Sequence, residues 1–181
     1  MINFNPADLA YDRIYTAQPM KGVCLFGGEF EPDDYSMIYC GAYFKNLYRI
    51  DPKMSGRGTL LTDNIEKILS SAADKGRTVV FRPVVCEGDF EADEELIKLI
   101  EADGDLYCNG KRRYPNWDNQ RLIEYFLDFI KQFGKAYDGD KRIACVQLGL
   151  YGMYGEWNYC GVRSEHQRVI TMSHESQVKI V

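Results

Sequence analysis

The stretch TDNIEKILSSAADKGRTVVFRPVV, residues 62–85, contains a helical pattern followed at once by a strand pattern. The first half predicts an amphipathic helix that begins at Asp63, has Glu66 as the partner residue of a capping box, and ends at Gly76. The second half is a short apolar run typical of a buried strand, and Pro83, which has no N–H group, predicts that the strand ends or bends there. A helix that leads directly into a buried strand is the repeating unit of parallel-sheet proteins.

The same alternation continues along the rest of the chain. Apolar runs bounded by Gly, Pro and Asp predict further strands at residues 22–26, 36–44 and 142–152. Helical periodicity predicts further helices at residues 94–102 and 118–137. The pattern fits either a doubly wound sheet or a (β/α)-barrel. Neither a G-x-G-x-x-G motif nor a Walker A motif is present, which favours the barrel and predicts that no nucleotide or other cofactor is bound.

Composition limits the class of protein and its partners. The 181 residues fit a single domain spanning 1–181, and the formal net charge of −5 argues against a nucleic-acid partner. No apolar run approaches the roughly 18 residues that span a bilayer, so no membrane association is expected. The first residues lack the basic and apolar regions of a signal peptide, which favours a cytoplasmic location.

The cysteines are widely spaced and form no C-x-x-C pair; they are Cys24, Cys40, Cys86, Cys108, Cys145 and Cys160. This spacing predicts free thiols, with those in the strand-like runs acting as small hydrophobic residues. Only two histidines are present, and none of the residues has the spacing of zinc ligands. No metal site is therefore expected.

Alternation along RIACVQLGLYG, residues 142–152, divides its side chains between two faces. The face suited to packing on helices carries Ala144, Val146, Leu148 and Leu150. The inner face carries Cys145, Gln147, Gly149 and Tyr151. The polar Gln147 beside a glycine suits a barrel interior near a ligand, and a hydrogen-bonded core glutamine is the alternative.

Glu156 follows this strand directly, in the stretch YGEWNY. Active sites of parallel α/β proteins lie at the carboxyl ends of the strands. Between Tyr154 and Trp157, the Glu156 carboxyl is expected to be partly desolvated. Desolvation raises the pKa of a carboxyl group, as a general acid that works near neutral pH requires.

The segment from Tyr114 to Tyr159 resembles the fourth-strand region of (β/α)8-barrel glycoside hydrolases, the clan that contains cellulases and β-galactosidases. It resembles more closely an uncharacterised family of glycosidase-like barrel proteins marked by the motif Q-x-G-x-x-G-x-x-G-E-W. The matching residues are Gln147, Gly149, Gly152, Gly155, Glu156 and Trp157. Weaker matches are QPMKGV (18–23), which resembles the family's entry segment, and GRTVVFRPVV (76–85), which resembles its third strand.

The resemblance implies that Glu156 is the catalytic acid/base of a glycosidase. One position departs from the characterised enzymes, which usually place Asn before this Glu to bind the substrate 2-hydroxyl; here it is Gly155. Aromatic side chains expected to stack on sugar rings are Trp157, Tyr154, Trp117 and Tyr114. Arg82 and Gln147 are the expected polar contacts to substrate.

Glycoside hydrolysis usually needs a second carboxyl group. In the resembled clan this group follows the seventh strand, whereas four strands are predicted here, with QVKIV (177–181) as the start of a fifth. Complete barrels take about 250 residues, so the chain is expected to form the first four to five βα units. Glu87 and Asp89 are the local carboxylates near the cleft, and their favoured interpretation is a polar loop that solvates a strand end.

The predicted function is hydrolysis of O-glycosyl bonds in an oligo- or polysaccharide. The alternatives are a barrel that binds carbohydrate without cleaving it, and a truncated product without activity. Half a barrel exposes unpaired strand edges. The chain is therefore expected either to form homo-oligomers or to be completed by a C-terminal half.

Overall fold

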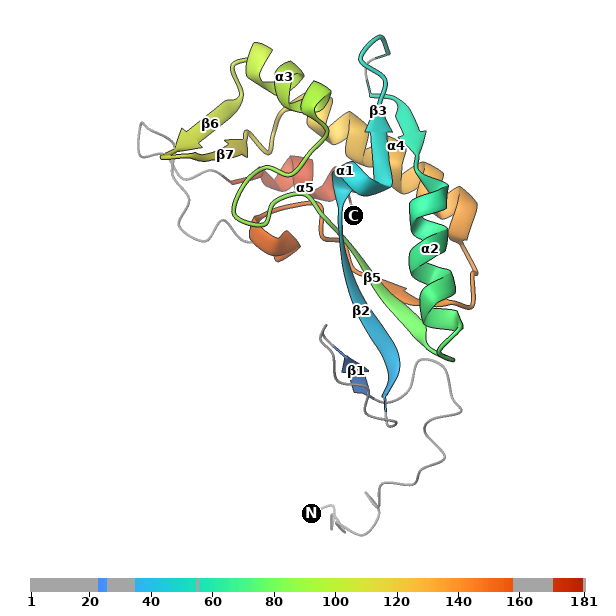
Figure 1. Ribbon diagram of the computed structural model, residues 1–181. Helices are drawn as coiled ribbons and strands as arrows, with labels where there is room; N and C mark the ends of the chain where they lie inside the picture. The colour runs from blue at the N-terminus through green and yellow to red at the C-terminus, as the bar shows by residue number, and fades with distance from the viewer. Residues whose placement is uncertain (1–22, 26–34, 55, 158–170, 181) are drawn as a thin grey trace, which may run out of the picture.

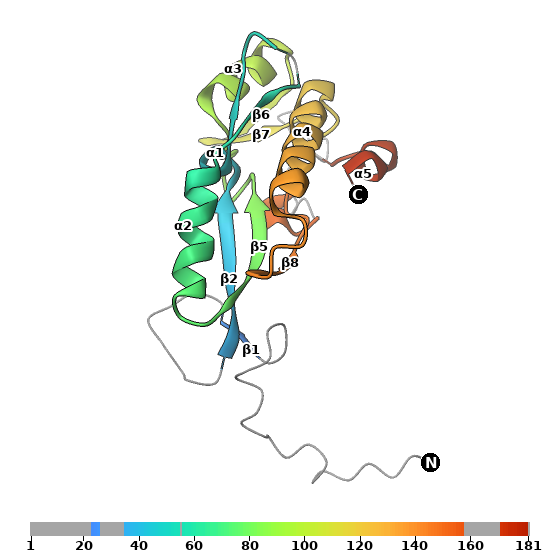
Figure 2. The same ribbon diagram turned by 90° about the vertical axis from the view of Figure 1, so that its right-hand side faces the viewer.

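The computed structural model describes residues 23–25, 35–54, 56–157 and 171–180. At its centre is a sheet of four parallel strands (Figures 1 and 2). In order across the sheet they are β1 (Val23–Leu25), β2 (Tyr35–Tyr43), β5 (Thr78–Val84) and β8 (Ile143–Val146). The mixed α/β class with a parallel sheet is confirmed. Among the described residues the sheet is open, with β1 and β8 as its edges, so they form no closed barrel.

Two long helices cover one face of the sheet. Helix α2 (Thr62–Ala73) runs alongside β2 and β5, and α4 (Gln120–Tyr137) leads into β8 (Figure 2). The buried Phe81 of β5 stacks on Phe133 of α4 with ring centroids 5.1 Å apart. Because side chains alternate along a strand, the neighbouring Arg82 points to the opposite face.

Both long helices were located correctly by periodicity, but their caps differ from the prediction. Helix α2 begins at Thr62 without a side-chain cap, so the predicted capping box is wrong. Its Glu66 instead pairs with Arg142, with Nη1 and Oε2 2.7 Å apart. At the start of α4, the Asn119 side chain accepts a hydrogen bond of 3.0 Å from the N–H of Leu122.

Strand β5 continues through Pro83 to Val84 rather than ending at the proline. The Phe81 carbonyl accepts a hydrogen bond from the N–H of Gln147, so the backbone groups of Phe81 point toward β8. Backbone groups two residues apart in a strand point to the same side, so an N–H at position 83 would also point toward β8. The pairing of β5 with β8 ends at Phe81 and Val146. The missing N–H of Pro83 therefore costs no ladder hydrogen bond.

Several small elements lie beyond the carboxyl end of the sheet, opposite β1 (Figure 1). Helix α3 was predicted with its observed bounds, whereas the two hairpins and α1 were not predicted. These elements are α1 (Phe44–Leu47), β3 (Tyr48–Ile50), β4 (Gly58–Leu60), α3 (Glu94–Ala102), β6 (Leu106–Asn109) and β7 (Arg112–Pro115). The sequence signal for the second hairpin was Asn109-Gly110, a pair that favours tight hairpin turns.

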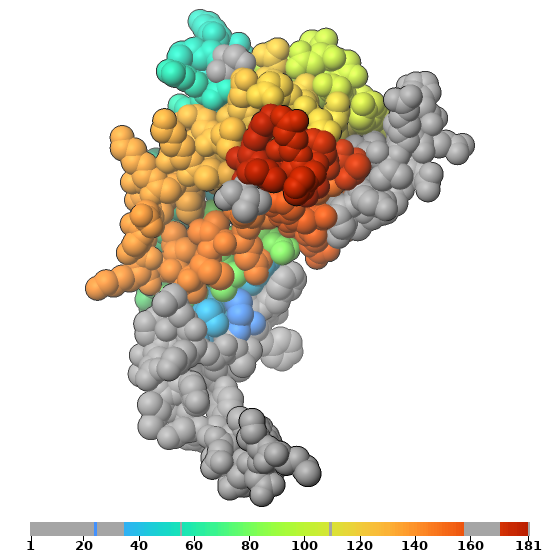
Figure 3. Space-filling model, turned by 180° about the vertical axis from the view of Figure 1, so that it is seen from behind, coloured from blue at the N-terminus to red at the C-terminus, as the bar shows by residue number. Residues whose placement is uncertain are grey.

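The segment expected to begin a fifth strand is helical: α5 spans His174–Ile180. Its buried Ser176 and Ile180 are four residues apart, which is the helical spacing. Helix α5 packs on the outside of α4 (Figure 3). Among the described residues, no helix combines the length and the apolar character needed to cross a membrane.

Arg142 fixes the start of β8 by pairing with Glu66 and, at 2.6 Å, with Asp140. These hydrogen bonds hold the pKa of both carboxyls below the usual range. Groups with a lowered folded-state pKa stabilise the fold at neutral pH and lose that effect as the pH falls through those lowered values. We expect Arg142→Met to lower the free energy of unfolding by about 1 kcal/mol at neutral pH, since both pairs are partly solvated.

Urea unfolding of wild type and Arg142→Met, at neutral pH and again below the ionisation range of both carboxyls, measures this effect. The difference between the two proteins should nearly vanish in acid. A difference of the same size at both pH values would mean that Arg142 stabilises the fold through packing alone.

Candidate functional site

The segment Gln147–Trp157 crosses the carboxyl end of β5, and its glycines allow a very close approach. A Cβ at Gly149 would lie 2.2 Å from the carbonyl oxygen of Pro83, and a Cβ at Gly155 would lie 2.4 Å from that of Gly149. Gly155 also has a φ of +66°, which strains any residue with a side chain. The motif glycines therefore stack backbone on backbone. An asparagine in place of Gly155 would not fit this arrangement.

The residues around Glu156 have an unusual backbone. Tyr154 and Trp157 have φ values of 56° and 58°, a left-handed conformation that costs a residue with a Cβ free energy. Hydrogen bonds hold this conformation: the N–H of Tyr154 donates to the Cys86 carbonyl at 2.6 Å, and the Trp157 indole donates to the Leu148 carbonyl. Strain of this kind clusters at functional sites.

Tyr154→Gly should relieve part of this strain. The side chain is 46% exposed, so its removal sacrifices little packing. We expect the variant to gain about 1 kcal/mol in free energy of unfolding, measured by urea denaturation. The same variant should bind its ligand more weakly, because the exposed ring is a cleft wall. A loss of stability would show that Tyr154 is not strained.

Two cavities meet at Glu156. The first, here called the tyrosine cavity, has a volume of about 510 Å³ and is lined by Tyr39, Gly41, Tyr43, Arg82, Val84, Glu87, Tyr154 and Glu156. The second, here called the glutamine cavity, has a volume of about 470 Å³ and is lined by Arg82, Gln147, Leu148, Gly155, Glu156 and Trp157. Both volumes are in the range of small-molecule sites. Arg82 and Glu156 belong to both cavities, so the two cavities adjoin, and together they are here called the cleft.

Two buried polar atoms in this cleft have no hydrogen-bond partner among the described residues. They are Nε of Arg82 and the side-chain oxygen Oε1 of Gln147. Buried polar atoms are nearly always hydrogen-bonded, so this unpaired donor and this unpaired acceptor are candidate contacts for a ligand. A hydroxyl group has both functions, since it can accept from Nε–H and donate to Oε1.

Arg82 is held in place from two sides. One of its terminal nitrogens, Nη1, donates to the Tyr154 carbonyl at 3.3 Å. The guanidinium carbon lies 5.7 Å from the centre of the Tyr39 ring, within the range of a cation–π contact. Arg82 thus connects the inner face of the sheet to the loop that carries Glu156.

No protein-family model matches this chain, and no curated protein sequence matches it either.

The predicted site residues fall into two groups. Glu156, Tyr154, Trp157, Arg82 and Gln147 line the cleft, while their roles in binding and catalysis stay predictions. Trp117 and Tyr114, expected to be sugar-stacking walls, are instead core residues with exposed fractions of 2% and 3%.

These two rings are buried because both pack within the hydrophobic core. Trp117 packs edge-on against Tyr151, with ring centroids 5.3 Å apart, and Tyr151 in turn meets Trp157 edge-on at 5.7 Å. Tyr114 lies on β7, and its hydroxyl donates to the Gly88 carbonyl at 3.4 Å. Trp117 therefore contacts Tyr151, and Tyr151 in turn supports the Trp157 ring that lines the cleft.

Two further expectations need correction. The Glu156 side chain is exposed, so the described residues do not desolvate it as expected. Strand β8 ends at Val146, and the predicted helix-packed face of this strand is only partly covered: Val146 and Leu148 are 43% and 37% exposed. Cys145 is exposed as well, so it is not a core residue.

Glu87, which the sequence analysis favoured as part of a solvating polar loop, also borders the cleft. It lines the tyrosine cavity together with Glu156, and the Tyr43 hydroxyl donates a hydrogen bond to it. Asp89 instead pairs with Arg113 at 3.3 Å. Tyr39 and Tyr43 were missed, although their period of two with Gly41 in the strand-like run was the available signal.

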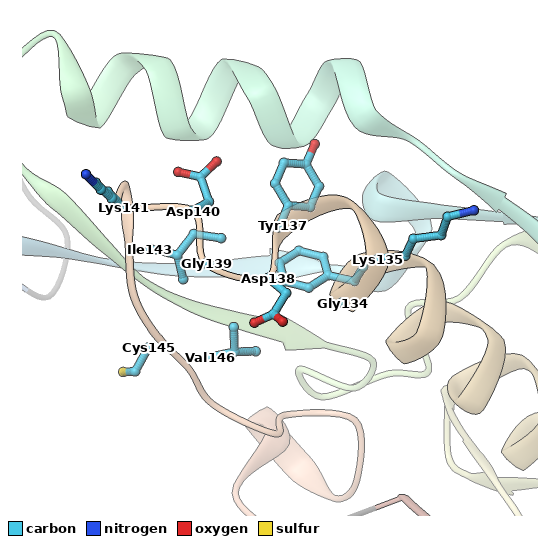
Figure 4. A pocket seen from close by; sticks show the side chains of 11 residues that line it. Gly134, Lys135, Tyr137, Asp138, Gly139, Asp140, Lys141, Ile143, Cys145 and Val146 are labelled. Carbon is cyan, nitrogen blue, oxygen red and sulfur yellow. The ribbon is translucent and has the colours of Figure 1, made fainter.

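A further cavity, of about 750 Å³, lies away from Glu156, between the end of α4 and the edge of β8. Figure 4 shows Tyr137, Ile143 and Val146 on its inner side, with Lys135 and Lys141 pointing away. It belongs to the helix-covered face of the sheet, where no described element packs over β8. This cavity therefore arises from the open edge of the sheet at β8 and is separate from the cleft at Glu156.

No cysteine is among the described residues that line the cleft. The five described cysteines are free, and Cys160 lies outside the described residues. Within the ranges that the structure describes, no three or more His, Cys, Asp or Glu side chains are grouped as metal ligands would be.

Proposed function

We propose that this protein is a glycoside hydrolase that cleaves O-glycosyl bonds of an oligo- or polysaccharide, with Glu156 as the general acid. The observation that carries the proposal is the pair of unpaired buried atoms, Arg82 Nε and Gln147 Oε1, in the same cleft as Glu156. A hydroxyl-rich ligand completes both atoms. The resemblance of the Gln147–Trp157 motif to glycosidase-like barrels gives independent support.

The proposed fold is the first half of a (β/α)8-barrel. The sheet order β1-β2-β5-β8 follows the order along the chain, whereas a doubly wound sheet reverses its direction at a switch point.

In this proposal, the cleft residues divide between binding and chemistry. A substrate hydroxyl accepts from Arg82 and donates to Gln147, while the exposed ring of Tyr154 lies against a sugar face. Glu156 protonates the glycosidic oxygen as the bond to the anomeric carbon breaks. Arg82 and Gln147 would thereby supply the hydroxyl contact that a residue at Gly155 cannot make.

Incubation of the wild-type chain with a panel of aryl glycosides and unlabelled oligosaccharides tests the proposal. We expect release of the aryl group from at least one member, and calorimetry should detect binding of the corresponding oligosaccharide. Binding without release would favour the non-catalytic carbohydrate-binding barrel. Neither binding nor release across the panel would contradict the proposal and favour the inactive fragment.

A further inference from the structure

We propose that Glu87 is the second catalytic carboxylate of this cleft, the general base that takes a proton from the attacking water. This inference rests on the proposed glycoside hydrolysis. It places the acid and the base on neighbouring strands of the same half barrel, so that no carboxylate from a later strand is required.

The fold brings Glu87 and Glu156 to the same place. Glu87 follows the carboxyl end of β5, which ends at Val84, and Glu156 follows β8, the next strand in the sheet. Both side chains line the tyrosine cavity, and Arg82 lines it with them. A cationic guanidinium beside two carboxylates lowers the cost of holding two negative charges in one cleft.

The surroundings of Glu87 differ from those of the next two acidic residues along the chain. Asp89 pairs with Arg113, and Glu91 pairs with Lys45 at the edge of a different cavity. Glu87 instead accepts a hydrogen bond from the neutral Tyr43 hydroxyl. Each carboxylate oxygen has two lone pairs, so this contact fixes the orientation of the group and leaves acceptor capacity for a water molecule.

Tyr43 is suited to hold this position. It is the last residue of β2, so its backbone is anchored in the sheet. The hydrogen bond to Glu87 is the largest cause that raises the pKa of Tyr43, so the phenol keeps its proton through the working range of a hydrolase. Tyr43 is a positioning residue, because it acts on substrate through Glu87.

The proposed hydrolysis needs one proton donor, one proton acceptor and one water molecule. The Glu156 carboxylic acid gives its proton to the glycosidic oxygen, which also takes the electron pair of the breaking bond to the anomeric carbon. Glu87 removes one proton from water, and the water oxygen forms the new bond to the anomeric carbon. One water is consumed, and exchange of one proton with solvent restores both carboxyls.

The exposure of Glu87 favours a base over a nucleophile. Its side chain is open to solvent, so water reaches the carboxylate directly. A cavity of about 510 Å³ also has room for water, which takes about 30 Å³ per molecule, beside a bound sugar. A base that activates water on the face opposite the leaving group inverts the anomeric configuration.

Kinetics of three variants with the substrate identified for the wild type test this inference. We expect Glu87→Gln to lower kcat by about 10²- to 10⁴-fold and to remove the fall in rate on the acidic side of the pH profile. Tyr43→Phe should lower kcat by up to about 10²-fold, the loss that misplacement of one group by 1 Å can cause, and leave KM unchanged. The matched control Glu91→Gln should retain wild-type kcat. Proton NMR of the first product should show an inverted anomeric centre.

The outcomes separate this inference from the proposed function. Wild-type turnover that Glu87→Gln leaves unchanged, or a retained anomeric configuration, would overturn the role of Glu87 while hydrolysis stands. No wild-type turnover on any substrate would overturn both. A Glu87→Gln protein that loses turnover must keep the wild-type unfolding curve and ligand affinity, since loss of either would assign Glu87 to structure or binding and overturn the catalytic role.

Discussion

Gly155→Ala should lower the free energy of unfolding by about 3 kcal/mol, the sum of a left-handed backbone penalty and a backbone clash. The added Cβ would lie 2.4 Å from the Gly149 carbonyl oxygen, and backbone atoms yield less readily than side-chain ends. Gly149→Ala should cost a similar amount, because its Cβ would lie 2.2 Å from the Pro83 carbonyl oxygen. Urea denaturation followed by circular dichroism measures both.

Gly134 provides the matched control. It lies within α4, with no atom within 4 Å of an added Cβ. Gly134→Ala should therefore raise the free energy of unfolding by about 0.5 to 1 kcal/mol, because alanine is the better helix former. If Gly155→Ala were as stable as the wild type, the backbone stacking that positions Glu156 would be refuted.

Glu156→Gln should lower kcat for an aryl or natural glycoside by about 10²- to 10⁴-fold, the usual contribution of a general acid. The amide keeps the size of the side chain but has no acidic proton. Binding should survive, because the hydroxyl contacts come from Arg82 and Gln147 in the same cleft. Steady-state kinetics and calorimetry on the same protein separate the two effects.

The control for this variant is Glu101→Gln, at an exposed carboxylate on α3. It changes the formal charge equally and should leave kcat and affinity unchanged. Equal losses in Glu101→Gln and Glu156→Gln would mean that net charge, rather than a positioned acid, explains the effect.

The central sheet and the long helices were predictable because their apolar periodicity is strong. In α4, the spacing of Leu122, Phe126 and Phe133 on one face admits only a helix, and these side chains are buried. The strands of the sheet were found for the same reason. The short hairpins were missed because three or four residues carry too little periodicity, and α5 was mistaken for a strand because its apolar residues are few.

The candidate site was partly predictable. Glu156 was proposed because it follows a predicted strand in a recognisable motif, although the observed strand β8 already ends at Val146. Glu87 was named from the sequence as a carboxylate near the cleft, but its contact with Tyr43 was not predicted, because sequence spacing does not show which strands are neighbours. Trp117 and Tyr114 were assigned to the cleft because an aromatic residue in a polar stretch has the same sequence pattern whether it is buried or exposed.

The close contacts of the motif glycines are likewise a tertiary property. Gly149 is needed because β5 passes beneath it at Pro83, and Gly155 because Gly149 lies beneath it in turn. The sequence pattern around each glycine does not reveal these backbone contacts, because they join segments that meet only in the folded chain. The stacking also explains why the asparagine of the resembled enzymes has no counterpart here.

Hydrolysis in water enriched in heavy oxygen tests the central claim most directly. Oligosaccharide would be incubated with wild type and with Glu156→Gln, and the products would be examined by mass spectrometry. The wild type should yield shorter sugars that carry one heavy oxygen at each new reducing end, and Glu156→Gln should yield almost none. Unlabelled and uncleaved sugar with the wild type, or equal labelling by both proteins, would contradict the assignment of Glu156 as the general acid of a glycoside hydrolase.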